Sequence, residues 1–174
     1  MRAEPMDELR EPSGSGHHTS QTTSERTQKT TMMILDCRLV PRRFPLTDTP
    51  DPGAVVPFAT WLASKARGED LSDVGVLFPN DKDVAELAPH LAELPVVALH
   101  FPRFQDGRAY TQARKLTHLL GYRGVVLATG DVLRDQVLYM SRVGFNAFHL
   151  REDQDAAATL NAFRLYSAFY QYAT

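Results

Sequence analysis

The chain of 174 residues is long enough for one folded domain with a sizeable core, because 43% of its side chains are apolar. Its 19 basic and 21 acidic residues leave a formal charge of -2, which does not favour non-specific binding to the phosphate backbone of nucleic acid. The single cysteine, Cys37, can neither form an internal disulfide nor hold zinc or an iron–sulfur cluster alone, so we expect no metal and no cofactor.

The first 31 residues differ in composition from the rest of the chain. They are rich in Ser, Thr, Gln, Glu and Gly and hold no aromatic residue, so we expect a disordered leader (1–31) before a single α/β domain (32–174). Translation could also begin at Met32 or Met33, directly before the first strand-like run. The N-terminus lacks a signal-peptide stretch, and no apolar run reaches the roughly 18 to 20 residues that span a bilayer. A cytoplasmic protein with no membrane partner is therefore expected.

The expected elements alternate between strands and helices along the chain. Short apolar runs bounded by turn residues predict strands at 33–40, 74–78, 95–101, 125–129 and 147–150. Capping residues and apolar residues at helical spacing predict helices from Pro57 to Ala66, after residues 80–83, at 107–120, after Asp131 and at 155–170. Trp61 is expected in the core.

Two of the expected helices end with the same pattern, Leu120-Gly121-Tyr122 and Val143-Gly144-Phe145. Each pattern predicts a left-handed glycine stop followed by an apolar residue. The glycines lie 23 residues apart, which fits one short helix and one strand and predicts parallel strands joined by right-handed crossovers. Four to five mainly parallel strands with βα repeats fit either an open doubly wound sheet or a partial barrel, and the sequence does not separate the two.

Arginines beside carboxylates recur in the loops that follow the expected strands. In either architecture these loops meet at the carboxyl ends of the strands, where ligands bind. Residues 101–123 hold five basic side chains against one acid and so carry a local charge of +4. Guanidinium groups near helix N-termini suit an oxyanion. The candidate substrate-binding residues are Arg103, Asp106, Arg108, Tyr110, Arg114, Asp131, Arg134, Asp135 and Gln136.

The same residues also have a purely structural interpretation. Asp106 and Asp131 stand where helix N-caps belong, and arginine–aspartate pairs between neighbouring loops commonly fix those loops in place. An anion site and a network that only ties loops together are therefore both compatible with the sequence.

Motifs in this region resemble the signature of a bacterial family, the domain of unknown function 934. In order they are Phe101-Pro102-Arg103-Phe104, Asp106-Gly107-Arg108, Tyr110-Thr111-Gln112-Ala113-Arg114, Gly121-Tyr122-Arg123-Gly124, Gly130-Asp131-Val132-Leu133-Arg134-Asp135-Gln136, and Gly144-Phe145 with Ala147-Phe148. The resemblance extends over about 33–163. Members of that family are described as oxidoreductases associated with sulfite reduction and are found beside sulfite reductase genes, so the resemblance implies a pathway rather than a reaction.

The chain departs from the family pattern at three positions. Family members commonly carry Cys where Val143 stands, Asp at Asn146 and Glu at His149, so any redox role of that cysteine is unavailable here. His149 is expected to be structural rather than a catalytic base. No Gly-x-Gly-x-x-Gly follows a strand, so the residues indicate no dinucleotide site of their own.

The leading hypothesis is an accessory protein of assimilatory sulfite reduction. The arginine-bearing loops would bind a small oxyanion, the sulfite reductase haemoprotein, or both, with the aspartates orienting the guanidinium groups. One alternative is a stand-alone enzyme in which Asp106, Tyr110 or Asp135 acts as general acid or base on an anionic metabolite. Another is a ligand-sensing or structural module. The aromatic residues of the last helix are expected in the core, with one side open to a subunit contact; they are Phe163, Tyr166, Phe169 and Tyr170.

Overall fold

The structure, a computed structural model, describes the backbone of residues 32–170 and the side chains of residues 32–164. The expected leader (1–31) and the side chains of Tyr166, Phe169 and Tyr170 lie outside the described residues. The described part folds into a seven-stranded sheet flanked by helices, with strand order β2-β1-β7-β6-β5-β4-β3. The α/β class expected from the sequence is confirmed.

The bounds of the elements follow the predicted alternation. The strands are β1 (Met32–Leu35), β2 (Arg38–Pro41), β3 (Val55–Pro57), β4 (Gly75–Phe78), β5 (Val96–Phe101), β6 (Val125–Gly130) and β7 (Ala147–Phe148). The α-helices are α2 (Phe58–Ala66), α3 (Arg108–Arg114), α4 (Val137–Arg142) and α5 (Ala156–Tyr170). Shorter turns complete the helical segments: the 3₁₀ helices η1 (Val84–His90) and η3 (Arg134–Gln136), and the π-helical turn η2 (Lys115–Leu119).

The strands β3 to β7 follow one another in chain order, and each is parallel to its neighbour. The strands β1 and β2 extend the sheet beyond β7 in antiparallel pairing. A doubly wound sheet reverses its strand order at a switch point, and no reversal occurs between β3 and β7. The parallel part is therefore arranged like a partial barrel rather than a doubly wound sheet.

The expected number of four to five strands was too low, for two local reasons. The strand expected at 33–40 is a hairpin of β1 and β2, which turns at Asp36 and Cys37 with φ of 47° and 58°. Two successive positive φ angles are typical of tight turns that favour Asn or Asp followed by Gly, and here Cys37 takes the place of the glycine. The strand β3 was missed because it has only three residues.

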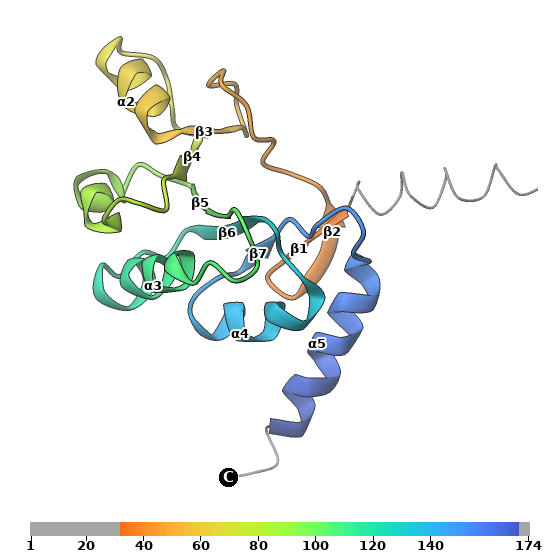
Figure 1. The fold of residues 1–174 in the computed structure, drawn as a ribbon. Coiled ribbons are helices and arrows are strands. Elements are labelled where there is room, and N and C mark those ends of the chain that lie inside the picture. The colour runs from red at the N-terminus through yellow and green to blue at the C-terminus, as the bar shows by residue number, and fades with distance from the viewer. Residues whose placement is uncertain (1–31, 171–174) are drawn as a thin grey trace, which may run out of the picture.

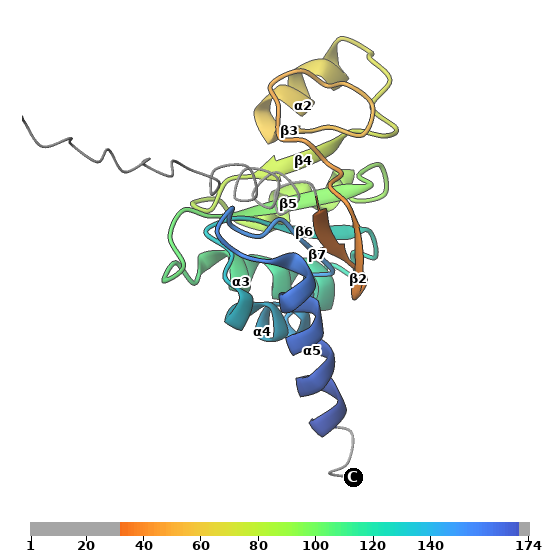
Figure 2. The same ribbon diagram turned by 90° about the vertical axis from the view of Figure 1, so that its right-hand side faces the viewer.

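The helices that the structure describes cover one face of the sheet only. In β5, Val97, Leu99 and Phe101 face the larger core cluster, which also contains Trp61 of α2 and Met140 of α4. Trp61 is fully buried, as expected. The intervening strand residues form a second cluster that contains no residue of a described helix. Figures 1 and 2 show α3, α4 and α5 on one side of the strands, with α2 beside the β3–β4 end of the sheet.

A segment without helix or strand, residues 42–54, covers part of the helix-free face. It connects β2 to β3, which are the two edges of the sheet, so it must cross the sheet from one side to the other. Phe44 packs against the apolar cluster of this face, and the Arg43 N–H donates to Met33 Sδ at 3.2 Å. We call residues 42–54 the crossing segment.

The two glycine stops are confirmed. Gly121 has φ of 68° and Gly144 has φ of 115°. The apolar residue behind each glycine donates its N–H back to the helix, from Tyr122 to Leu116 O at 3.0 Å and from Phe145 to Met140 O at 3.1 Å. These bonds satisfy carbonyl groups at the helix ends and turn the chain toward the next strand.

The two stops should differ in their tolerance of a side chain. A Cβ at Gly121 would meet no atom within 4 Å, whereas a Cβ at Gly144 would lie 2.4 Å from Thr117 Oγ1. We expect Gly121→Ala to lower the free energy of unfolding by about 1 to 2 kcal/mol, through left-handed strain alone. Gly144→Ala should cost at least about 1 kcal/mol more, because Thr117 must also move. Urea denaturation of both variants measures the difference, and equal losses would contradict it.

Candidate functional site at the carboxyl ends of the strands

The loops that follow β5, β6 and β7 meet where these parallel strands end, at their carboxyl ends. These loops, with the short turn η3 included, are residues 102–107, 131–136 and 149–155 and are called the rim here. Backbone bonds bring them together: Asp131 N–H donates to Phe101 O at 2.8 Å, and Arg151 N–H donates to Val132 O at 3.1 Å. The carboxyl ends of parallel strands are where α/β proteins place their ligand sites.

Phe104 lies at the centre of the rim and is held by its backbone. Its N–H donates to Asp131 Oδ2 at 2.9 Å, and its carbonyl accepts from Gln136 Nε2 at 3.0 Å. The Phe104 side chain nevertheless remains 45% exposed. The rim thus fixes the position of this loop while leaving its aromatic ring open to a partner.

Asp131 joins three loops rather than capping a helix. Besides Phe104 N–H, it accepts a bond from Arg151 Nη1 at 2.8 Å. The expectation that Asp131 is an N-cap was wrong, because the chain stays extended at Leu133 and helical structure begins only at Arg134. Arg151 also forms a two-pronged ion pair with Asp153, whose pKa this pairing lowers to about 2.

Asp106 and Arg108 form an ion pair within one loop. Arg108 Nη2 lies 2.6 Å from Asp106 Oδ2, and Arg108 Nε lies 3.0 Å from Oδ1. The Asp106 carboxylate also accepts from the Arg108 N–H at 3.2 Å, although the N-cap position itself is Gly107. The bonds to Arg108 lower the pKa of Asp106 to about 2. Asp106 is consequently an anion at neutral pH, and its charge is balanced by Arg108.

The rim holds two candidate arginines whose guanidinium groups stay available within the described part of the chain. Neither Arg103 nor Arg134 forms an ion pair with a described residue, and both side chains are exposed. Arg134 lines a hollow of about 250 Å³ between η3, α4 and α5. Its other lining residues are Asp135, Leu138, Ala162 and Phe163.

Tyr110 and Arg114 contribute no side-chain hydrogen bond or ion pair to this arrangement among the described residues. The Tyr110 ring packs against Phe101 and Tyr139, each with a centroid distance of 5.1 Å. Burial, helped by Tyr139 and Asp135, raises the pKa of Tyr110. Arg114 is the last residue of α3, about 9 Å along the helix axis from Arg108, and its exposed side chain forms no ion pair with a described residue.

Sequence reasoning missed a row of polar residues at the same end of the sheet, on the helix-free face. His100 and Thr129 are partners in the β5–β6 register, and His100 Nδ1 lies 3.3 Å from Thr129 Oγ1. His149 follows β7 and donates its N–H to Ala128 O, beside Thr129. The alternation of side chains along β5 and β6 was the available signal, because it places His100 and Thr129 opposite the helix-facing residues.

His149 links β7 to the crossing segment, as a structural histidine would. Its Nε2 lies 2.7 Å from Arg43 O, and because a carbonyl can only accept, Nε2 carries the proton. Nδ1 is buried and has no hydrogen-bond partner among the described residues. Burial, together with the charge of Arg42, lowers the pKa of His149 to about 4, so the imidazole is neutral at physiological pH.

The described residues contain no group of three or more His, Cys, Asp or Glu side chains that could hold a metal ion. Among the helices in the described part, none is long and apolar enough to cross a membrane. The side chains of the rim can supply charge pairing and hydrogen bonding by the guanidinium groups of Arg103 and Arg134, beside the exposed ring of Phe104.

The clamp on Phe104 should depend on Asp131. In Asp131→Ala, we expect the Phe104 amide to exchange its hydrogen about tenfold faster or more, because its charged acceptor is lost. Asp153→Ala removes only the other partner of Arg151 and should leave that rate unchanged. Amide exchange followed by NMR distinguishes the two variants, and equal rates in both would contradict the assigned role of Asp131.

His149 should make stability depend on pH below neutrality. An unfolded histidine takes up a proton near pH 6.5, whereas folded His149 does so only near pH 4. The free energy of unfolding should therefore fall as pH drops from about 6.5 to about 4, by up to about 3 kcal/mol. His149→Gln can still donate to Arg43 O, and its denaturation profile should be flatter in this window. Parallel profiles would contradict the prediction.

Comparison with known proteins assigns the chain to a family. No curated protein matches it. The family described as "Bacterial protein of unknown function (DUF934)" matches residues 75–174, which are 100 of the 174 residues and contain every candidate site residue. The match begins at β4, so it leaves out β1 to β3 and α2, although the resemblance was expected to start near Met33. The chain belongs to this bacterial family.

Proposed function

We propose that the protein is an accessory protein of assimilatory sulfite reduction that docks through its rim to a negatively charged surface of the sulfite reductase haemoprotein. The pathway comes from the family resemblance, in which members are associated with sulfite reductase genes. The docking residues come from the rim, and they are Arg103, Phe104 and Arg134.

The observation that carries the proposal is the presentation of Phe104. Its backbone is bound on both sides, by Asp131 and Gln136, while its ring remains 45% exposed. A partner that contacts this loop has little conformational entropy left to remove, which favours binding. Aromatic and arginine side chains are also the residues that most often dominate binding energy at protein interfaces.

The free guanidinium groups favour a protein surface over a free oxyanion. Arg103 and Arg134 are exposed and have no ion pair with a described residue, so each can meet a carboxylate of a partner. The hollow at Arg134 also contains the Asp135 carboxylate, which would repel a small anion bound there. On a partner surface, by contrast, acidic and basic groups can be matched separately with Arg134 and Asp135.

The alternative of a stand-alone enzyme receives less support from the same residues. A general base for neutral pH works best with a pKa near 7, whereas the pKa of Asp106 is about 2 and its charge is paired with Arg108. The pKa of Tyr110 is raised by burial, which makes it a weaker acid. We therefore propose a binding role rather than acid–base catalysis.

Binding to the haemoprotein should depend on the two rim arginines, Arg103 and Arg134, and not on the total number of exposed arginines. We expect the full chain to co-purify with the haemoprotein. The double variant Arg103→Ala/Arg134→Ala should bind more weakly, with a dissociation constant about 10- to 100-fold higher. Arg114→Ala removes an exposed arginine outside the rim and is the matched control. Calorimetric titration at two salt concentrations should also show weaker binding at high salt.

Two outcomes would contradict this proposal. The first is equal binding by the double variant and by Arg114→Ala. The second is a deletion strain that grows normally with sulfite as its sulfur source, since loss of an accessory protein should create a requirement for sulfide or cysteine.

A further inference from the structure

The hollow of about 250 Å³ at the rim, between η3, α4 and α5, has an apolar wall that is open to solvent. Leu138, Ala162 and Phe163 form this wall, and each of the three side chains is only half-buried. Phe163 also packs against the larger core cluster, so the wall is anchored in the core. We call this space the η3 hollow.

Two side chains of opposite charge complete the lining of the η3 hollow. They are Arg134 and Asp135, both are exposed, and neither forms an ion pair with the other or with any other described residue. A charged group inside the hollow would be attracted by one of them and repelled by the other. An uncharged apolar group can fill the hollow without that conflict, while the Arg134 guanidinium stays available to an acid beside it.

The exposed aromatic side chains of the described residues gather around the same turn. Among the Phe, Tyr and Trp side chains that the structure describes, Phe104 and Tyr139 are the exposed ones, at 45% and 57%. The Phe104 carbonyl accepts from Gln136 of η3, and Tyr139 follows Asp135 by four residues, about one helical turn. Exposed apolar side chains that cluster in this way mark interaction surfaces.

The η3 hollow is held in place by bonds at both ends of its short turn. The Arg134 N–H donates to Gln154 Oε1 at 3.2 Å, and Gln136 Nε2 donates to Phe104 O at 3.0 Å. A hollow that is already formed costs a partner little ordering entropy. Its volume lies below the roughly 300 to 1,000 Å³ of small-molecule sites, and so it suits a single side chain.

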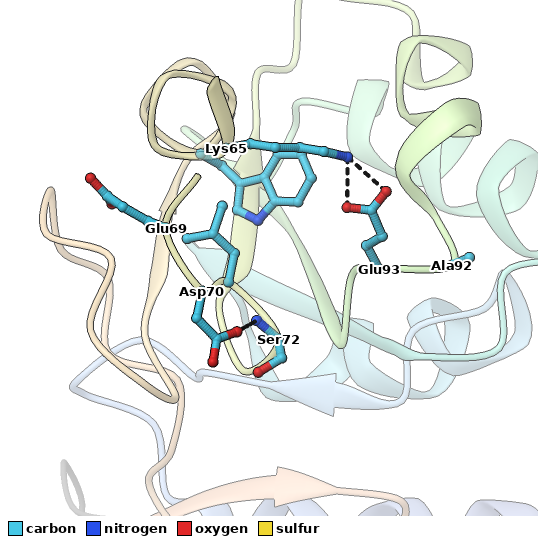
Figure 3. A pocket seen from close by; sticks show the side chains of 8 residues that line it. Lys65, Glu69, Asp70, Ser72, Ala92 and Glu93 are labelled. Carbon is cyan, nitrogen blue, oxygen red and sulfur yellow. Dashed lines mark hydrogen bonds and ion pairs between the residues drawn. The ribbon is translucent and has the colours of Figure 1, made fainter. Parts of the chain in front are cut away.

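A larger pocket, of about 490 Å³, stands at the amino ends of β4 and β5 and has a different lining (Figure 3). Four of its eight lining residues are charged, and they are Lys65, Glu69, Asp70 and Glu93. Lys65 Nζ lies 2.6 Å from both carboxylate oxygens of Glu93, as the dashed lines in Figure 3 mark. An apolar side chain in this pocket would take water away from these charges, which is unfavourable.

We propose that the η3 hollow receives an aliphatic side chain of the size of leucine from the surface of the haemoprotein, next to an acidic residue that pairs with Arg134. This inference rests on the proposed function and names the element of the haemoprotein that the rim recognises. The aliphatic group packs on Leu138, Ala162 and Phe163. An anchor that fills a pocket in this way contributes more binding energy than the contacts around it.

A blocked leucine tests the hollow without the haemoprotein. N-acetyl-L-leucine N-methylamide carries the aliphatic side chain and no charge, and N-acetylglycine N-methylamide is the matched probe without that side chain. In an NMR titration of the full chain, the leucine probe should shift the methyl signals of Leu138 and Ala162 saturably, with a dissociation constant on the order of 1 mM. The glycine probe should give no saturable shift. The indole N–H signal of Trp61, the only tryptophan, reports on the larger pocket and should not move with either probe.

A pair of variants tests the hollow in the complex. Ala162→Trp fills the hollow from α5, and it should raise the dissociation constant of the haemoprotein complex about tenfold or more and abolish binding of the leucine probe. Ala63→Trp places the same side chain at an exposed position of α2, outside the rim and the hollow, and should bind the haemoprotein as the natural chain does. Circular dichroism checks that both variants fold.

Three results would overturn the inference. The first is an equal effect of the leucine and glycine probes on the methyl signals, a result that needs no variant to fold. The second is a folded Ala162→Trp chain that binds the haemoprotein as tightly as Ala63→Trp, while Arg103→Ala/Arg134→Ala binds weakly; the proposed function would then stand. The third is a natural chain that does not bind the haemoprotein, which overturns both the proposed function and the partner assigned here, even where the leucine probe still binds.

Discussion

The architecture depends on one constraint, the order of the parallel strands. Because β3 to β7 follow chain order and crossovers between parallel strands are right-handed, every connecting helix falls on the same face. The opposite face carries no helix of the described part of the chain, and the crossing segment packs there, fixed in part by the bond between His149 and Arg43 O. Because β3 to β7 are parallel, the loops that follow them gather at their carboxyl ends, and the loops that precede them gather at their amino ends.

The folded structure redistributes the positive charge seen between residues 101 and 123. Arg108 is neutralised by Asp106, and Lys115 is neutralised by Asp83 at 2.7 Å. Arg123 immediately precedes β6 and so stands at the far end of the sheet. Arg103 is the arginine of this stretch that stays on the rim without an ion pair to a described residue, and Arg134 joins it from the next loop. Among the described residues, this stretch of five basic side chains therefore gives the rim one unpaired guanidinium group, that of Arg103.

The two ends of the sheet offer different chemistry. At the rim, Asp131, Gln136 and Arg151 use their polar groups to fix the loops, so an aromatic ring and two cations are presented to the outside. At the amino end, a hollow of about 490 Å³ is lined by the Lys65–Glu93 ion pair and by residues that precede β4.

The sequence by itself determined the features that rest on near neighbours in the chain. The βα alternation, the left-handed stops at Gly121 and Gly144 and the burial of Trp61 follow from local spacing, and the family was identifiable from local motifs. The hairpin at Asp36 and Cys37 was not predicted, because a tight turn of this kind usually has Gly where Cys37 stands. Only the tertiary structure decided which rim arginines lack an ion pair with a described residue, because Asp131 meets partners 27 and 20 residues away in sequence. Pairing between distant loops depends on the order of the strands, and no local pattern encodes that order.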